Sequence, residues 1–163
     1  MSDLTTPRLV LRPWTAPDVA AVRADHRSAR WADDFPAEGD RVIAALLDEH
    51  PAWFGPYGHR LIAERETGLL IGSIGLFWPP SDGILELGYG IAPSRRGRGY
   101  ATEATRALAA HALTAAEVHT VSATVELSNP SSVRVLEKSG FRAWATEDNT
   151  ARFRLTLHDL ERR

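Results

Sequence analysis

The sequence SRRGRGYATEA, residues 94–104, crowds three arginines and two glycines ahead of a run of residues that favour helix. A strand-like run that Pro93 ends comes before it, so the stretch is expected to join a strand to a helix. The first N–H groups of a helix have no internal partners, and the helix dipole adds positive charge at that end. Glycine lets the main chain approach a ligand closely, so this turn predicts an anion site suited to phosphate. The alternative is a solvated basic turn that only precedes a helix.

This turn differs from two common nucleotide-binding loops. No Gly-Lys-Ser/Thr follows it, as a Walker loop requires. It also lacks the Gly-x-Gly-x-x-Gly spacing that follows the first parallel strand of dinucleotide-binding folds. We therefore expect a ligand that contains a pyrophosphate but belongs to neither of these classes.

The composition is that of one globular domain, residues 1–163. Hydrophobic residues make up 44% and charged residues 25%, and the net charge of −2 argues against a dedicated nucleic-acid partner. The absence of cysteine excludes disulfides, a thiol nucleophile and a cysteine metal site. No signal-peptide pattern and no apolar run of membrane-spanning length is present, so we expect a cytoplasmic protein without a membrane partner.

The hydrophobic pattern predicts strands and helices in the order β-α-α-β-β-β-α-β-α-β-β. Thr15 and Asp40 are the expected caps of the first two helices, and Gly68 the turn of a hairpin. The expected strands cover residues 8–14, 60–65, 69–78, 83–93, 119–127, 141–145 and 151–160, and the expected helices cover 15–30, 39–54, 97–115 and 129–139. This order predicts an α/β fold with a mixed, mostly antiparallel central sheet and helices on both faces.

Four stretches resemble the GNAT superfamily of N-acetyltransferases, in the order expected for it. The residues Arg96-Gly97-Arg98-Gly99-Tyr100-Ala101 are similar to its acetyl-CoA signature, Arg/Gln-x-x-Gly-x-Gly/Ala. The other three are TTPRLVLRPW, ELGYGIAP and NPSSVRVLEKSGF, at residues 5–14, 86–93 and 129–141. Together they resemble the branch that contains the ribosomal-protein alanine N-acetyltransferases, over roughly residues 5–157.

The resemblance implies acetyl-CoA as the acyl donor. Main-chain amides of the turn would hold its pyrophosphate, and the pantetheine arm would pair with the strand near Ile91 and Ala92. Asn129 would cap the last helix and contact the pantetheine arm. The expected cofactor-binding residues are Ile91, Ala92, Arg96, Gly97, Arg98, Gly99, Tyr100, Ala101, Asn129 and Ser132.

Acetyl transfer to an amine requires a base and a proton donor for the departing thiolate. Glu86 is the candidate base, because it shares a strand face with Gly88 and Gly90 and so has open space beside it. A partly dry site would make this carboxylate a better base. The alternative is a solvated glutamate that at most positions the amine.

The tyrosine that many relatives carry on the last helix is replaced here by Leu136. The resemblance to the ribosomal branch implies Ser132 as the proton donor, although a serine near a helix start also caps locally. Tyr89 and Tyr100 are the alternatives. We therefore expect direct attack by a primary amine in a ternary complex, or, without catalysis, an acyl-CoA-binding sensor or interaction module.

The acceptor side is less defined. In the family the first two helices line it, and the stretch WADDFPAEGD, residues 31–40, supplies Asp33, Asp34, Glu38 and Asp40. These acids would attract a cationic amine, or they form a solvated charge run. They do not separate a protein N-terminus from a small-molecule amine. The six histidines show no metal-ligand spacing, so no metal is expected. A homodimer stays open.

Overall fold

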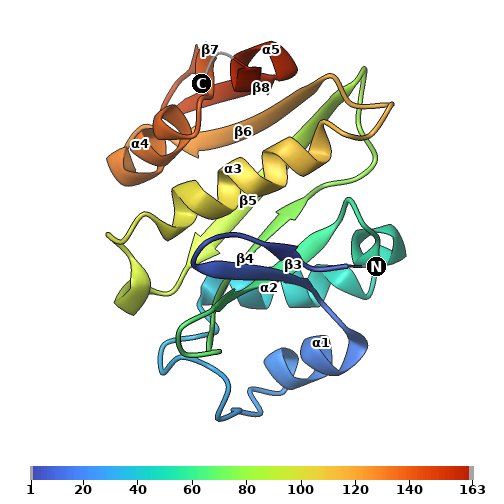
Figure 1. Cartoon of the computed structure of the whole chain (residues 1–163), viewed down its shortest axis with the longest axis vertical. Coiled ribbons are helices and arrows are strands. Elements are labelled where there is room, and N and C mark those ends of the chain that lie inside the picture. Colours follow the sequence, from blue (N-terminus) through green and yellow to red (C-terminus); the bar gives the residue numbers. More distant parts are fainter. Residues whose placement is uncertain (1, 162–163) are drawn as a thin grey trace.

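The computed structural model describes residues 2–161, which form one eight-stranded sheet in the order β1-β2-β3-β4-β5-β6-β8-β7 (Figure 1). All neighbouring strands are antiparallel except β5 and β6, which are parallel. The strands are β1 (Leu4–Thr5), β2 (Leu9–Pro13), β3 (His59–Glu64), β4 (Leu70–Leu76), β5 (Ile84–Ile91), β6 (Thr120–Glu126), β7 (Arg142–Glu147) and β8 (Thr150–Thr156). The mixed, mostly antiparallel sheet predicted from the sequence is confirmed.

Helices lie on both faces of the sheet, and α3 crosses the face toward the viewer in Figure 1. They are α1 (Ala16–Arg23), α2 (Glu38–Leu47), α3 (Tyr100–Ala112), α4 (Pro130–Lys138) and α5 (Leu157–Glu161), with short 3-10 turns η1 (Pro51–Phe54) and η2 (Pro93–Arg95). The predicted order of elements is confirmed, with β1 and α5 added at the ends. No helix within residues 2–161 has the length and apolarity that crossing a membrane would require.

The strand register assigns each face to a helix. Ser73 of β4 donates a hydrogen bond to Asp40 of α2 at 2.5 Å, so the face that carries Ser73 lies against α2. The Tyr100 hydroxyl of α3 donates to Glu64 of β3 at 2.8 Å on the opposite face. In β5, Gly90 is opposite Ser73, which places the even-numbered residues of β5 on the α2 face and the odd-numbered residues on the α3 face.

Two helix boundaries and one strand boundary differ from the sequence prediction, each for a local reason. The N-cap of α2 is Ala37, and Asp40 accepts a hydrogen bond from the Ala37 amide at 2.8 Å instead of capping the helix itself. The first helix ends at Arg23, well before residue 30, because Asp25 has a positive φ of 52°. The last strand ends at Thr156, whose amide donates to Asp159 at 2.9 Å as α5 begins.

In the C-terminal half of the sheet, α3 and α4 cover one face, and α5 contacts the other face only near Thr156 and Arg142 within residues 2–161. Val121, Ala123 and Val125 of β6 are buried on the face that α3 and α4 cover. On the opposite face Thr124 and Glu126 are exposed. This half of the sheet therefore presents an open polar surface.

Candidate active site

The parallel strands β5 and β6 separate partway along their length. Their pairing covers three positions and ends at Glu86 and Ser122, although β5 continues to Ile91 and β6 to Glu126. A cavity of about 560 Å³ lies beside the separated part of β5, between that strand, the start of α3 and the helix α4. Its lining includes Tyr89, Gly90, Ile91, Arg95, Arg96, Gly97, Gly99, Tyr100, Ala101, Thr102, Asn129, Ser131, Ser132, Arg134, Val135 and Lys138.

The edge of β5 at this cavity offers main-chain hydrogen-bonding groups. Phe77 N–H donates to the Glu86 carbonyl, and Ala92 N–H donates to the Ile71 carbonyl. Antiparallel pairing alternates, so the groups of even-numbered residues face β4 and those of Tyr89 and Ile91 face the opposite edge. β6 no longer pairs there. An extended chain lying in the cavity can therefore bond to this edge as an added strand would.

The loop that leads into α3 presents a row of donor groups. Within the described chain, no partner accepts from the N–H groups of residues 97–102. Gly97 and Gly99 have positive φ angles of 77° and 81°, which residues with a side chain rarely adopt. Gly99 is the N-cap of α3, so these donors lie at the positive end of a 13-residue helix. Such a row can hold a diphosphate.

The three arginines of this loop point in different directions. Arg96 donates through Nε to the Ile91 carbonyl at 2.9 Å and lines the cavity. Arg95 also lines the cavity, but its Nε lies 3.3 Å from a Glu64 oxygen. Arg98 does not line the cavity, and its Nη1 lies 3.6 Å from the same Glu64 oxygen. The side chain of Arg98 therefore faces away from the ligand site for which the sequence suggested it.

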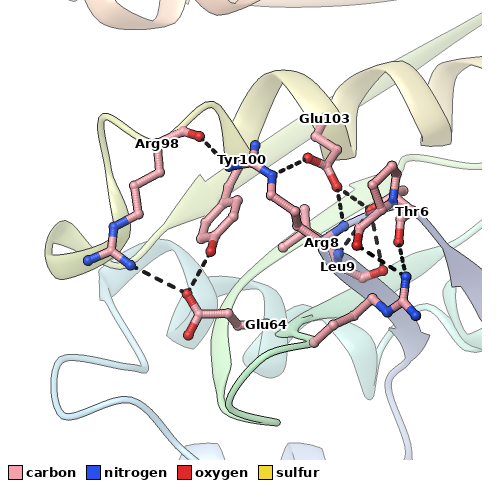
Figure 2. A network of polar contacts seen from close by, with 9 residues as sticks. Thr6, Arg8, Leu9, Glu64, Arg98, Tyr100 and Glu103 are labelled. Carbon is pink, nitrogen blue, oxygen red and sulfur yellow. Dashed lines mark hydrogen bonds and ion pairs between the residues drawn. The ribbon is translucent and has the colours of Figure 1, made fainter.

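Glu64 is the buried anchor of the loop (Figure 2). It accepts from the Tyr100 hydroxyl at 2.8 Å and from Thr67 at 2.8 Å, with Arg95 beside it. Burial alone would raise the pKa of Glu64, but the hydrogen bonds from Thr67 and Tyr100 and the charge of Arg95 lower it below its ordinary value. Burial and the neighbouring Glu64 both raise the pKa of Tyr100. Its hydroxyl therefore stays protonated and holds the loop by donating to Glu64.

A second ion pair fixes the loop from the other side (Figure 2). Arg8 donates through Nε to Glu103 at 2.7 Å and through Nη1 to the Arg98 carbonyl at 2.7 Å. Thr6 donates to the same Glu103 carboxylate at 2.6 Å. The N-terminal segment is thereby tied to the first turn of α3. Sequence reasoning missed this network, because its partners lie more than 90 positions apart.

The start of α4 forms the opposite wall of the cavity. Asn129 accepts from the Ser132 amide at 3.3 Å and caps the helix as predicted. The Tyr89 hydroxyl is buried at the same wall, and no group meets hydrogen-bonding geometry with it. Burial raises the pKa of Tyr89, and the nearby Ser132 opposes that rise. Leu136 is only 1% exposed, so it packs in the core and leaves no polar group at its position.

Two residues expected from the sequence at this site are placed elsewhere. Glu86 is exposed on the α2 face, at the last paired position of β5, and is not part of the cavity lining. The partly dry environment expected for it is therefore absent. The Ala92 amide donates to Ile71, and its carbonyl accepts from Arg95. Both main-chain groups of Ala92 therefore already have partners within the protein.

The acidic stretch at residues 31–40 is only partly available to a ligand. Asp34 accepts from the Ser94 amide at 2.7 Å and from its hydroxyl at 2.8 Å, so it holds the loop that begins the cofactor turn. Asp40 is buried, and burial raises its pKa against the opposing bonds from Ser73 and Ala37. Asp33 and Glu38 are exposed. No group of three acidic or histidine side chains in residues 2–161 is placed to hold a metal ion.

Comparison with known proteins defines the class. The family profile described as an acetyltransferase (GNAT) domain matches residues 8–142, and the chain belongs to this family. It is therefore an acetyl-CoA-dependent N-acetyltransferase, which confirms the family predicted from the sequence. The finer assignment to the ribosomal branch stays a prediction.

Solved structures agree with this class. The chain is similar to an acetyltransferase from Agrobacterium tumefaciens, with 29% identity over 95% of this chain and 94% of that chain, and a TM-score of 0.70. A candidate ribosomal-protein-serine acetyltransferase from Vibrio cholerae shares 20% identity over 95% and 97%, with a TM-score of 0.69. Spermidine N-acetyltransferase from Vibrio cholerae, solved in complex with CoA and spermine, shares 17% sequence identity over 94% of this chain and 98% of that chain, with a TM-score of 0.69. A dodecameric structure of that enzyme is also similar to this chain. The likenesses to these Vibrio cholerae proteins show the fold alone.

Proposed function

We propose that the cavity binds acetyl-CoA and that the acetyl group passes to a primary amine presented at Glu86. The observation that carries this proposal is the row of unpaired N–H groups at residues 97–102, at the end of the cavity where β5 finishes. A diphosphate on that row would direct the pantetheine arm along β5 toward the point where β5 and β6 meet. Glu86 is located at that point.

We assign the binding of acetyl-CoA to a set of residues that differs in part from the set expected from the sequence. The amides of Gly97, Gly99 and Ala101 bind the diphosphate, and Arg96 adds positive charge beside them. The main chain of Ile91 and Asn129 of α4 hold the pantetheine arm. Arg134 and Lys138 of α4 also line the cavity, and their charges suit the phosphates of the nucleotide end. Tyr100 and Arg98 act through the Glu64 network, and the main chain of Ala92 has no part.

The chemistry is assigned to Glu86, at the last paired position of β5, and to Ser132 of α4, in the wall of the cavity. Glu86 accepts a proton from the ammonium, directly or through one water, and the free amine attacks the thioester carbonyl. The new N–C bond forms and the C–S bond breaks; the thiolate takes a proton from Ser132, and the second proton that the attacking nitrogen releases passes to solvent, which restores the Ser132 hydroxyl. The Tyr89 hydroxyl beside Ser132 can relay the proton that restores it. The chain has no cysteine for a covalent intermediate, so direct transfer in a ternary complex is the simplest route.

The proposal also includes a domain assignment, a family branch and an oligomeric state. The eight strands form one sheet, which supports a single N-acetyltransferase domain over residues 1–163. The order of the four motifs supports the branch of ribosomal-protein alanine N-acetyltransferases. A homodimer is compatible with the exposed edge strand β7.

The test is release of free thiol from acetyl-CoA across a panel of amines, including N-terminal peptides. We expect turnover with at least one primary amine, and loss of coenzyme A binding in Gly99→Glu, which places a carboxylate among the phosphate donors. Tight coenzyme A binding without turnover of any acceptor would instead support an acyl-CoA-binding sensor or interaction module.

A further inference from the structure

The open face of the sheet beside Glu86 carries a line of basic side chains. Glu86 of β5 pairs with Ser122 of β6, Ser122 pairs with Arg154 of β8, and Arg154 pairs with Arg142 of β7. Paired residues of neighbouring strands point to the same face. These four residues therefore form one row across the sheet, on the face opposite the cavity proposed to bind acetyl-CoA. The next pair along β6 and β8 is Thr124 and Arg152, which adds a third arginine to the same face.

Two of these arginines have no acidic partner within residues 2–161. The guanidinium of Arg154 lies 3.6 Å from the centroid of the Trp144 ring, and its Nε is buried without a hydrogen-bond partner. Arg152 is exposed and forms no ion pair. Arg142 differs, because it pairs with Asp159 at 2.9 Å. An anion from outside the chain would therefore contact Arg154 through the terminal nitrogens of its guanidinium, which carry four of its five N–H donors.

The spacing fits a small acceptor that has charges of both signs. Neighbouring strands lie about 4.8 Å apart, so the Cα atoms of Glu86 and Arg154, two strands apart, are separated by about 10 Å. Both side chains are long and can reach toward each other across Ser122. The remaining gap accommodates an ammonium and a carboxylate separated by a few bonds.

The other side of Glu86 is apolar. A Cβ atom added to Gly88 would lie 3.2 Å from the ring of Phe77, so that ring covers Gly88 on the same face. Phe77 packs edge-on against Trp53. This wall supplies no partner for a second cationic group. Two exposed acidic side chains also lie on this face, Glu126 of β6 and Glu147 of β7, which both pair with Thr150 at the end of the sheet far from Glu86.

We propose that the acceptor is an amine with a carboxylate a few bonds away, whose ammonium faces Glu86 and whose carboxylate is held by Arg154 with Arg152. Trp144 keeps the Arg154 guanidinium flat and oriented for a bidentate contact. A polyamine is disfavoured, because its second ammonium would approach two unpaired guanidiniums. The inference rests on the proposed transferase function and adds the class of acceptor.

The experiment compares acceptors that differ only in charge. Thiol release from acetyl-CoA is measured with γ-aminobutyrate and its amide, with β-alanine and its amide, with the peptides Ala-Asp-Gly and Ala-Asn-Gly as C-terminal amides, and with spermidine. Wild type is compared with Arg154→Gln and Arg154→Lys. Arg106→Gln is the matched control, because Arg106 is exposed on α3, away from this face.

Each carboxylate acceptor should exceed its amide by about ten- to a hundredfold in kcat/KM, mainly through KM, as expected for one charge-assisted contact. Arg154→Gln should remove that preference and leave the amides within about twofold of wild type. Arg154→Lys should keep part of the preference for carboxylate acceptors, and Arg106→Gln should keep all of that preference. A preference among the free amino acids alone indicates a small-molecule acceptor, and one among the peptides indicates a protein N-terminus with an acidic second residue.

Four results would overturn the inference. Equal rates for the carboxylate and amide acceptors, or better turnover of spermidine, would remove it while leaving the transferase function intact. An equal loss for both acceptors in Arg154→Gln would mean that the residue serves only folding. No thiol release with any amine would reject the proposed function, and this inference with it.

Discussion

Replacing Ala101 by proline deletes one of the main-chain donors at the proposed diphosphate site and adds no charge. Ala101 is the second residue of α3 and lines the cavity. Its N–H has no acceptor within residues 2–161, so the helix loses no hydrogen bond. Proline is tolerated in the first turn of a helix for this reason. The remaining cost is the restriction that proline places on Tyr100 before it.

The expected effect is a weaker hold on coenzyme A. A hydrogen bond to a charged group contributes roughly 1.5–3 kcal/mol, so losing one should raise the Kd about 10- to 150-fold. The matched control is Gly39→Pro, at the second position of α2, where an added Cβ has no neighbour within 4 Å. It carries the same type of backbone restriction away from the cavity.

The measurement is calorimetric titration with coenzyme A, paired with thermal unfolding of both variants. We expect similar Tm values for Ala101→Pro and Gly39→Pro, and loss of affinity in the first only. An unchanged Kd in a folded Ala101→Pro protein would refute the placement of the diphosphate. If the variant unfolds far below its control, Gly99→Glu gives the second measure, since its carboxylate should repel the ligand.

Three further predictions concern the chemistry and the loop. Glu86→Gln should lower kcat most at neutral pH with little change in the Kd for coenzyme A; an unaltered pH–rate profile removes Glu86 as the base. Ser132→Ala should reduce kcat about 10²-fold or more if Ser132 is the proton donor, and Tyr89→Phe should reduce it less; the reverse order in single-turnover rates would make Tyr89 the donor. Because the pKa of Glu64 is depressed in the fold, its stabilising effect is complete above a pH of about 4.5 and is lost as the pH falls through the folded pKa. Denaturant unfolding of wild type and Glu64→Gln should therefore converge as the pH falls below this value, and a constant difference down to pH 3 would contradict the linkage.

The parts of the fold that depend on neighbouring residues were predictable from the sequence. Gly97 and Gly99 indicated the loop because only a few local conformations join a strand to a helix with free donors. Asn129 and Pro130 marked the start of α4 for the same kind of reason. Each of these signals lies within a few residues of the structure that it predicts.

Other features depend on which segments meet in space. Nothing near Glu64 in the sequence indicates that it would anchor Arg95 and Tyr100, because that contact needs the packing of β3 against α3. The exposure of Glu86 and the open arginine row depend on which sheet face the helices leave bare. From its charge alone, Asp34 was expected to attract the acceptor amine, but in the structure it accepts a hydrogen bond from the Ser94 amide.

The early end of the β5–β6 pairing has a consequence for how the molecule holds together. Within residues 2–161, the main chains on the two sides of the gap are linked by the pairs from Ile84 to Glu86 and by bonds from the His119 and Thr120 amides to the Gly83 carbonyl. A pantetheine chain bound between β5 and β6 would contact both strands and connect the two halves of the sheet where their own pairing has ended. The two halves should then rotate less against each other, and the amides of Tyr89 and Ile91 should exchange their hydrogens more slowly.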